Sequence, residues 1–235
     1  MNEELKIGAL IYSRLSSSRF PKKALAFLGE NTVLDWCISG AKELAECKVI
    51  VATSNEVEDD ELAELAQNRG VESFQGDLNN VAMRTIACCE KFELDYFFRI
   101  NGDSPFLNLL LMKQALDILK DNKYDLISNL IPRSYPYGMS CELVKVDSFK
   151  KVYHHFDESQ KEHITSYYYT NPEQFNIAAL PVLSHDYSKI RLTVDTPYDL
   201  EILSKWQKTK DPKELYHLDP ANFGKELEEL KKKKK

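Results

Sequence analysis

The fold is decided by the stretch Ile7-Gly8-Ala9-Leu10-Ile11, which continues as Tyr12-Ser13-Arg14-Leu15-Ser16-Ser17-Ser18-Arg19-Phe20-Pro21-Lys22-Lys23-Ala24-Leu25. Its apolar start predicts a buried strand. The loop that follows combines arginine, a planar fork of donors, with lysine, a compact charge. The serines between them are small enough for backbone N–H groups to reach an anion. The loop therefore favours binding of phosphate oxygens, and a solvated basic loop is the alternative that its composition leaves open.

Strand-like and helical stretches alternate behind this loop. Helical spacing of apolar residues predicts helices over 32–45, 58–69, 79–92 and 107–119. Short apolar runs predict strands over 49–52, 71–74, 96–100 and 125–127. This order predicts an α/β fold, a mostly parallel twisted sheet with helices on both faces.

The second half of the chain is less regular. It predicts a loop over 134–140, helices over 148–156 and 159–169, and strands over 142–146, 175–180 and 190–194. The neighbours of the 142–146 strand stay open. Pro197 is well placed to begin a helix that runs to Trp206. We expect one domain over 1–210 with an insertion around 130–175, and a helical, lysine-rich tail over 211–235.

Composition narrows the class of protein. The 235 residues carry a net charge of −6, which argues against a nucleic-acid partner and favours a small anionic ligand for the basic loop. No apolar run approaches the roughly 18 residues of a membrane span, and the acidic start of the chain predicts no signal peptide. The terminal lysines are expected to be a solvated helix end, with contact to an acidic membrane surface as the alternative.

The cysteines number five, without the spacing of a metal site. Cys88 and Cys89 fall in a helical pattern, where buried thiols are expected. Free thiols are typical of a reducing compartment, so we expect a cytoplasmic protein.

Three polar clusters follow predicted strands: the basic loop, Asn101-Gly102-Asp103, and Asp195. Open α/β sheets bind ligands beyond the carboxyl ends of their strands. Two carboxylates facing a basic loop predict a site for a magnesium ion and a polyphosphate, because magnesium combines carboxylate ligands with phosphate oxygens and water. The alternatives are a turn aspartate for Asp103 and a helix N-cap for Asp195.

The basic loop resembles the Ala-Arg-x-Gly-Ser-x-Arg-x-Pro-x-Lys-x-Leu loop of the cytidylyltransferase-like nucleotidyltransferases, most closely in the branch of the spore coat polysaccharide biosynthesis protein F. Further matches follow in the order of the family, and the resemblance covers about residues 5 to 205. They lie at 51–54 with 58–60, 76–77 with Val81 and Arg84, 99–105, 135–138 with Glu142, 162–165 and 191–197.

The resemblance implies a Rossmann-like, nucleotide-diphospho-sugar transferase-like fold that binds CTP. The implied catalytic residues are Arg14, Arg19 and Lys23 on the triphosphate, and Asp103 and Asp195 on magnesium. The nucleotide site would also include Tyr12, Ser16, Ser18, Thr53, Ser54, Arg84, Asn101 and Gly102, with Thr53, Ser54 and Arg84 near the base. Tyr135, Gly138, Glu142, Glu162 and His163 would face the acceptor, which makes the insertion around 130–175 the acceptor side.

Three positions depart from the family pattern. Ser16 stands where glycine is usual, which questions a backbone conformation of positive φ. Tyr12-Ser13 replaces small residues and crowds the place of the base, and Ser140 removes an acceptor-side carboxylate. These departures are compatible with a changed nucleotide, a changed acceptor or lost activity.

His163 and the tyrosine run 167–169 each allow two interpretations. His163 is a general base or acceptor contact, or a histidine packed within a helix. The tyrosines predict a half-buried helix at the subunit contact of a homodimer, or a platform for sugar stacking.

The sequence thus favours a magnesium-dependent cytidylyltransferase of bacterial surface-polysaccharide synthesis. It would transfer CMP from CTP to a sugar, sugar phosphate or sugar acid with release of pyrophosphate. A glycosyltransferase that uses a nucleotide sugar is one alternative, although the Asp-x-Asp pair common in such enzymes occurs nowhere in the sequence. A non-catalytic nucleotide- or sugar-binding relative is the other.

Overall fold

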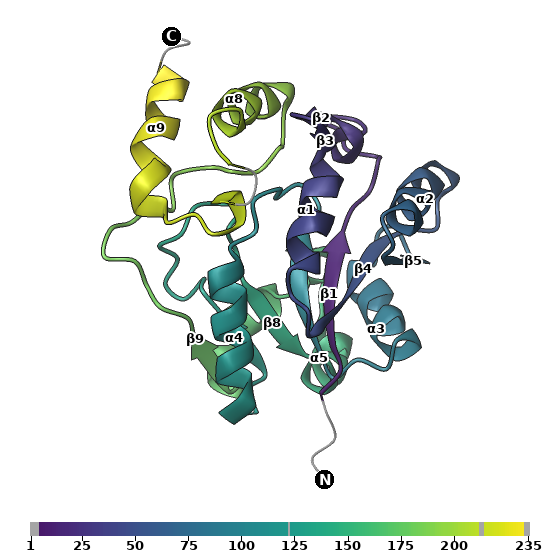
Figure 1. Ribbon diagram of the computed structural model, residues 1–235. Helices are drawn as coiled ribbons and strands as arrows, with labels where there is room; N and C mark the ends of the chain where they lie inside the picture. The colour runs from purple at the N-terminus through teal and green to yellow at the C-terminus, as the bar shows by residue number, and fades with distance from the viewer. Residues whose placement is uncertain (1–4, 122, 212–213, 233–235) are drawn as a thin grey trace.

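A seven-stranded sheet forms the centre of the protein (Figure 1). The computed structural model describes residues 5–121, 123–211 and 214–232. The strands, in sheet order, are β5 (Glu72–Gly76), β4 (Cys47–Ser54), β1 (Ile7–Tyr12), β6 (Tyr96–Asn101), β8 (Glu142–Lys145), β7 (Leu126–Ser128) and β9 (Ile177–Ala179). A separate hairpin pairs β2 (Phe27–Leu28) with β3 (Asn31–Thr32).

Parallel pairing predominates in the sheet. β1 lies between β4 and β6 and is parallel to both, and β5 continues the parallel order beyond β4. β8 is antiparallel to both of its neighbours, β6 and β7, while β7 and β9 are parallel. The predicted fold class is confirmed, and the open question of the 142–146 strand is answered by its place between β6 and β7.

Helices cover both faces of this sheet. They are α1 (Val33–Lys42), α2 (Asp60–Asn68), α3 (Val81–Lys91), α4 (Leu109–Asp121), α5 (Val146–Val152), α6 (Glu158–Glu162), α7 (Ser166–Thr170), α8 (Pro197–Gln207) and α9 (Pro220–Lys232). Short 3-10 turns lie at Lys23–Leu25, Val57–Asp59, Tyr153–His155, Pro172–Gln174 and Glu214–Tyr216. Pro197 is the first residue of α8, as predicted, and Thr196 caps the helix together with Asp199.

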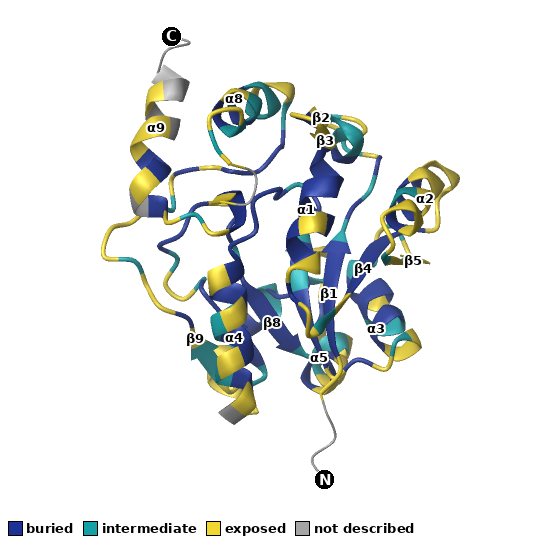
Figure 2. Cartoon of the chain, viewed as in Figure 1, coloured by how far each residue is buried: buried dark blue, intermediate teal, exposed yellow. Residues whose placement is uncertain are grey.

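The alternation of side chains along the strands builds two cores. Ala9 and Ile11 of β1 face a core that includes α1, α2 and α4, whereas Leu10 faces a second core with α3, α5 and α7. Strands buried on both faces are expected for a parallel sheet, and the central strands are mostly buried, as the dark blue of β1 in Figure 2 shows. Burial raises the pKa of Cys88 to about 12, in keeping with the buried thiols that the sequence predicts there.

The C-terminal helices return to the start of the chain. α8 contacts the β2–β3 hairpin, and the ring of Trp206 lies 5.4 Å from those of both Phe106 and Phe223. α9 ends at Lys232, so the terminal lysines 233–235 and the N-terminal residues 1–4 lie outside the described residues. The division of the chain near residue 210 stays a prediction.

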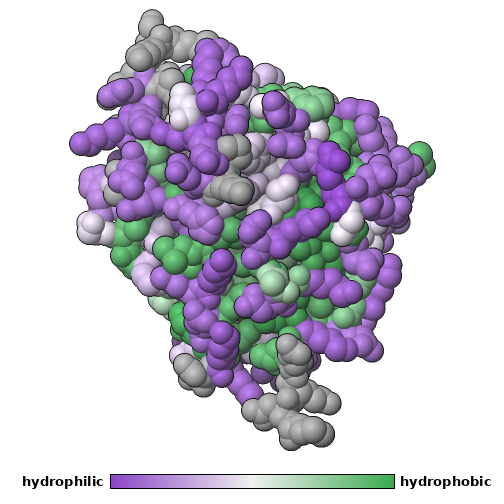
Figure 3. Space-filling model, viewed as in Figure 1, coloured by the Kyte–Doolittle hydropathy of each residue, from purple (hydrophilic) through white to green (hydrophobic). Residues whose placement is uncertain are grey.

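The outer surface of the molecule is mixed. On the face seen in Figure 3, hydrophilic side chains surround apolar ones that gather near the middle of the view. None of the helices in the described ranges is long and apolar enough to cross a membrane. The homodimer stays a prediction.

Two predicted elements are wrong in the second half. The segment 190–194 is not a strand of the sheet: it makes an isolated bridge from Arg191 to Tyr137, and its apolar alternation reflects burial of Leu192 and Val194 beneath the loops. The predicted helix 159–169 is interrupted, because α6 ends at Glu162 and His163 leaves the helical conformation at ψ 68°. The β-branched pair Ile164-Thr165 follows, and α7 begins one turn later.

Candidate active site

A cleft of about 550 Å³ opens where β1 and β6 end. This is the edge at which open α/β sheets bind ligands. Its walls come from six parts of the chain: the end of β1 with the basic loop, α3, the end of β6, the turn at Tyr137, the α6–α7 junction and the segment 191–195. The predicted site residues that line it are Tyr12, Arg14, Ser16, Ser18, Arg19, Lys23, Arg84, Asn101, Gly102, Asp103, Glu162, His163 and Asp195.

The basic loop is held from below by a buried carboxylate. Asp59, 2 % exposed, accepts the backbone N–H of Leu15 at 2.7 Å and the hydroxyl of Ser54 at 2.5 Å. Thr53 and Ser54 are fully buried and do not line the cleft. Ser54, predicted near the base, therefore fixes the loop through Asp59.

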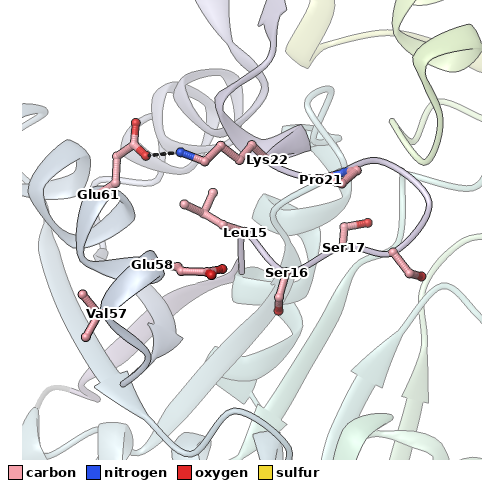
Figure 4. A pocket seen from close by; sticks show the side chains of 9 residues that line it. Leu15, Ser16, Ser17, Pro21, Lys22, Val57, Glu58 and Glu61 are labelled. Atoms are coloured by element: carbon pink, nitrogen blue, oxygen red, sulfur yellow. Dashed lines mark hydrogen bonds and ion pairs between the residues drawn. The ribbon is translucent and has the colours of Figure 1, made fainter.

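The back of the loop forms a separate hollow against α2 (Figure 4). Lys22 spans it and pairs with Glu61 at 3.1 Å. Lys22 is also the left-handed residue of the loop, with φ 56°, whereas Ser16 does not adopt positive φ. The serine at this position therefore meets no conformational demand for glycine.

Asp103 and Asp195 meet around the ammonium group of Lys23. The Lys23 Nζ lies 2.6 Å from Asp103 Oδ2 and 3.3 Å from Asp195 Oδ1. A backbone hydrogen bond of 2.9 Å from Val194 N–H to the Asp103 carbonyl joins the two segments. Asp103 does occupy the predicted turn, but Asp195 is not the N-cap of α8, because Thr196 is.

Three basic side chains surround Asp195. Arg19 and Arg191 each lie 2.9 Å from its carboxylate, and Lys23 completes the set. Burial alone would raise the pKa of Asp195, but together Arg191, Lys23 and Arg19 outweigh it and lower that pKa. The carboxylate is therefore charged at neutral pH.

The carboxylate oxygens of Asp103 and Asp195 are suitable ligands for a small divalent cation. Two carboxylates already share one cationic group, and oxygen ligands are those that magnesium prefers. Within the described residues there is no group of three or more His, Cys, Asp or Glu side chains that could hold a metal ion. A cation here would complete its shell with phosphate oxygens and water.

The α3 wall contains a buried arginine without partners for two of its nitrogens. Arg84 is 3 % exposed, and its Nε and Nη1 atoms make no hydrogen bond. Its burial lowers the pKa of the guanidinium. Tyr12 lies nearby with its hydroxyl 2.9 Å from Thr85 Oγ1, which fixes the ring against α3. The two nitrogens without partners are sealed from solvent, and other atoms of Arg84 line the cleft.

The residues predicted on the acceptor side divide into two groups. Glu162 and His163 are exposed at the cleft, so the interpretation of His163 as a packed helical residue is wrong. Tyr135, Gly138 and Glu142 are buried and do not line it. Gly138, at φ 98°, lets the chain lie against the backbone of Leu192: an added Cβ would be 3.0 Å from its carbonyl carbon.

Among the cleft residues that the predicted site did not include, three carry a phenol ring or a guanidinium group: Arg99, Tyr137 and Arg191. The guanidinium groups of Arg133 and Arg191 lie 4.3 and 4.9 Å from the ring centre of Tyr137. All three cleft residues fall inside motifs that the sequence comparison had matched, which is the signal that could have found them. The tyrosine run does not line the cleft: Tyr168 is fully buried.

Comparisons with known proteins agree with this geometry. The family model described as "Cytidylyltransferase" matches residues 8–234. An uncharacterized protein of Methanocaldococcus jannaschii is 31 % identical over 88 % of this chain and 85 % of its own length. The spore coat polysaccharide biosynthesis protein SpsF of Bacillus subtilis is 26 % identical over 82 % of each chain.

More distant relatives include the 3-deoxy-manno-octulosonate cytidylyltransferase of Rickettsia bellii, 25 % identical over 53 % of this chain and 52 % of that protein. Among solved structures, a cytidylyltransferase from Leptospira borgpetersenii has a TM-score of 0.85 and 27 % identity, covering 98 % of this chain and 95 % of that one. By its sequence and by its structure, the chain belongs to the cytidylyltransferase family.

Proposed function

We propose that the protein is a magnesium-dependent cytidylyltransferase that transfers CMP from CTP to a sugar, sugar phosphate or sugar acid used in surface-polysaccharide synthesis. The observation that carries the proposal is the junction of Lys23 with Asp103 and Asp195, beside Arg14 and Arg19. Family membership supports the use of CTP. The names of the SpsF and 3-deoxy-manno-octulosonate relatives support polysaccharide synthesis and a sugar-acid acceptor.

The triphosphate is assigned to the basic loop. In the free protein Arg14 pairs with Glu162 at 3.2 Å, and Arg19 and Lys23 pair with the aspartates. In their pairs Arg14 is partly exposed and Arg19 is exposed, and such pairs contribute little stability, so phosphate oxygens can replace their carboxylates. Ser16 and Ser18 line the same part of the cleft.

The base is assigned to the α3 side, next to Tyr12. Arginine only donates hydrogen bonds, and Arg84 brings a guanidinium to the lining of the cleft. The O2 and N3 atoms of cytosine are acceptors that match such donors. Thr53 is fully buried and does not line the cleft, so no contact with the base is assigned to it.

The reaction joins an acceptor oxygen to the α-phosphorus while the bond from that phosphorus to the leaving pyrophosphate breaks. Magnesium held by Asp103 and Asp195 would supply charge neutralisation at the phosphates. Lys23 and Arg19 turn from the aspartates to the phosphates and hold the leaving group. His163, exposed at the cleft, is placed to take the proton of an acceptor hydroxyl.

Calorimetric titration tests the nucleotide assignment. CTP, UTP, ATP and GTP are titrated with magnesium into the wild type, Asp103→Ala and the control Asp117→Ala, which changes an exposed aspartate of α4. We expect a preference for CTP that weakens in Asp103→Ala and persists in the control. Equal binding of all four nucleotides, or no effect of Asp103→Ala, overturns the proposal.

A pyrophosphate-release assay tests the reaction. CTP and magnesium are offered with sugars, sugar phosphates and 2-keto sugar acids. We expect release of pyrophosphate that depends on the acceptor. Release of nucleoside diphosphate from a nucleotide sugar would instead identify a glycosyltransferase.

A further inference from the structure

Arg99 lines the cleft from the sheet rather than from the basic loop. It belongs to β6 and stands opposite Leu10 of β1 in the parallel register. Its side chain is 19 % exposed and lines the cleft. In the sheet, β1, which ends at Tyr12, lies between β4 and β6. The helix of Arg84, α3, packs on β4. Arg99 and Arg84 therefore lie on opposite sides of β1 and Tyr12.

A buried network fixes this arginine. Glu142 of β8, 1 % exposed, accepts Arg99 Nη1 on Oε2 at 2.9 Å and the hydroxyl of Tyr169 on Oε1 at 2.6 Å. The Tyr169 hydroxyl is in turn 2.9 Å from Ser128 Oγ. Burial opposes the charge on Arg99, but Glu142 outweighs it and raises the pKa of the guanidinium.

The network leaves donors of Arg99 for a ligand. Both oxygens of Glu142 accept hydrogen bonds from the protein, and Glu142 is 1 % exposed and does not line the cleft, so an acceptor in the cleft does not contact its carboxylate. A guanidinium has five N–H donors, and Glu142 engages Nη1. Within the described residues, the buried side-chain atoms without partners include two nitrogens of Arg84 but none of Arg99. The other donors of Arg99 therefore open into the cleft.

The surroundings of Arg99 favour a ligand other than the triphosphate. The basic loop already provides three cationic side chains for the phosphates, so the triphosphate does not need Arg99. The residues assigned to the acceptor, Glu162 and His163, line the same cleft from the α6–α7 junction. A buried ion pair is a costly way to stabilise a fold. An arginine held in fixed orientation is suited to bidentate binding of a carboxylate or phosphate.

We infer that Arg99 is a second anion site, which binds a carboxylate or phosphate group of the acceptor, and that Glu142 and Tyr169 are its positioning residues. The inference rests on the proposed function and narrows its acceptor to anionic molecules, excluding neutral sugars. It also changes the expected role of Glu142, which acts on the acceptor through Arg99.

Binding measurements with the triphosphate loop occupied test this inference. Wild-type protein is saturated with magnesium and α,β-methylene CTP, whose binding is measured first by calorimetry. N-acetylneuraminate and 3-deoxy-manno-octulosonate serve as carboxylate probes, glucose 1-phosphate as the phosphate probe, and glucose and the methyl ester of N-acetylneuraminate as neutral probes. Saturation-transfer NMR ranks their affinities.

The test variant is Arg99→Gln/Glu142→Gln, which removes both charges together and leaves two amides that can bond to each other. Lys150→Gln/Glu90→Gln removes an exposed ion pair and is the matched control. We expect the test variant to bind the favoured anionic probe about tenfold more weakly or worse, while its affinity for the CTP analogue is unchanged. Tyr169→Phe should show a smaller loss of the same kind.

The carboxylate and phosphate probes distinguish the two sources of the anion. The proposal is overturned if wild type binds no anionic probe better than the neutral ones, or if the test variant binds the probes as wild type does. It is also overturned if the test variant loses the CTP analogue instead. If wild type itself fails to bind the analogue, the proposed function fails, and the comparison of wild type with the test variant on the free protein still decides the role of Arg99.

Discussion

The two walls of the cleft hold their charges in different ways. On the loop wall, Arg14 and Arg19 reach across the cleft to Glu162 and Asp195 from partly exposed positions. On the β6 wall, Arg99 is anchored to the fully buried Glu142. Exposed pairs exchange partners at little cost, whereas a buried pair keeps its geometry because breaking it strands a charge. We therefore expect the side chains of the loop wall to rearrange when a ligand binds and those of the β6 wall to stay fixed.

The largest effect is expected from a variant that breaks the buried Arg99–Glu142 pair of the β6 wall. Glu142→Ala leaves the Arg99 charge buried without its partner and should lower the free energy of unfolding by about 3–5 kcal/mol. Urea unfolding followed by circular dichroism measures this loss. Arg99→Gln/Glu142→Gln should recover much of it. A loss from Glu142→Ala below that of the double variant would contradict the comparison.

A second variant separates stability from binding at Arg84. Replacing this buried arginine by methionine removes two donors without partners and should raise the free energy of unfolding by about 1–3 kcal/mol. The same change should weaken CTP binding, since the proposed base contacts are lost. Thermal unfolding and calorimetry on one preparation measure both quantities. A destabilised Arg84→Met would mean that this guanidinium is satisfied in the free protein.

The third prediction concerns pH at Asp195. Because its pKa is lowered in the folded protein, Asp195 stabilises the fold above its unfolded pKa of about 4. This contribution is lost as the pH falls from that value through the folded pKa. Asp195→Asn should therefore lower the urea midpoint at pH 7 and leave it nearly unchanged in strong acid. A difference from wild type that is the same at both pH values would exclude this linkage.

The smallest effect belongs to the rearrangeable wall. Glu162→Gln breaks the exposed pair with Arg14 and should change the free energy of unfolding by at most about 1 kcal/mol. Released from Glu162, Arg14 should bind CTP as well as or better than in wild type. Lys205→Gln, which breaks an exposed pair on α8, is the control. If Glu162→Gln lowered the free energy of unfolding about as much as Glu142→Ala, the two walls would not differ in the way proposed.

The loop wall was predictable from sequence because its geometry follows from local rules. Parallel strands end at one edge of a sheet, so the basic loop and Asp103 had to meet. Asp195 reached the same edge although its segment is not a strand of the sheet: the backbone bond from Val194 to Asp103 brings it there. Apolar residues do alternate over 190–194, but the cause is the packing of this segment against the Gly138 turn and not pairing in the sheet.

The β6 wall was harder to predict, since its positions depend on register. Glu142 was expected to face the acceptor, yet its burial is set by the place of β8 between β6 and β7. Thr53 and Ser54 were likewise expected near the base and are fully buried. A single sequence fixes neither the order of antiparallel strands nor which face of them is buried. The sequence therefore identified these polar residues but not how deeply each side chain is buried.

The ammonium group between Asp103 and Asp195 acts as a built-in counter-ion. A divalent cation that arrives alone must displace Lys23 and leave that ammonium without a carboxylate. A cation that arrives together with a triphosphate gives Lys23 new oxygen partners as it takes the aspartates. Entry of the two is then thermodynamically linked, each raising the affinity for the other. At the proposed magnesium site, Lys23 would therefore compete with a divalent cation that binds without a triphosphate.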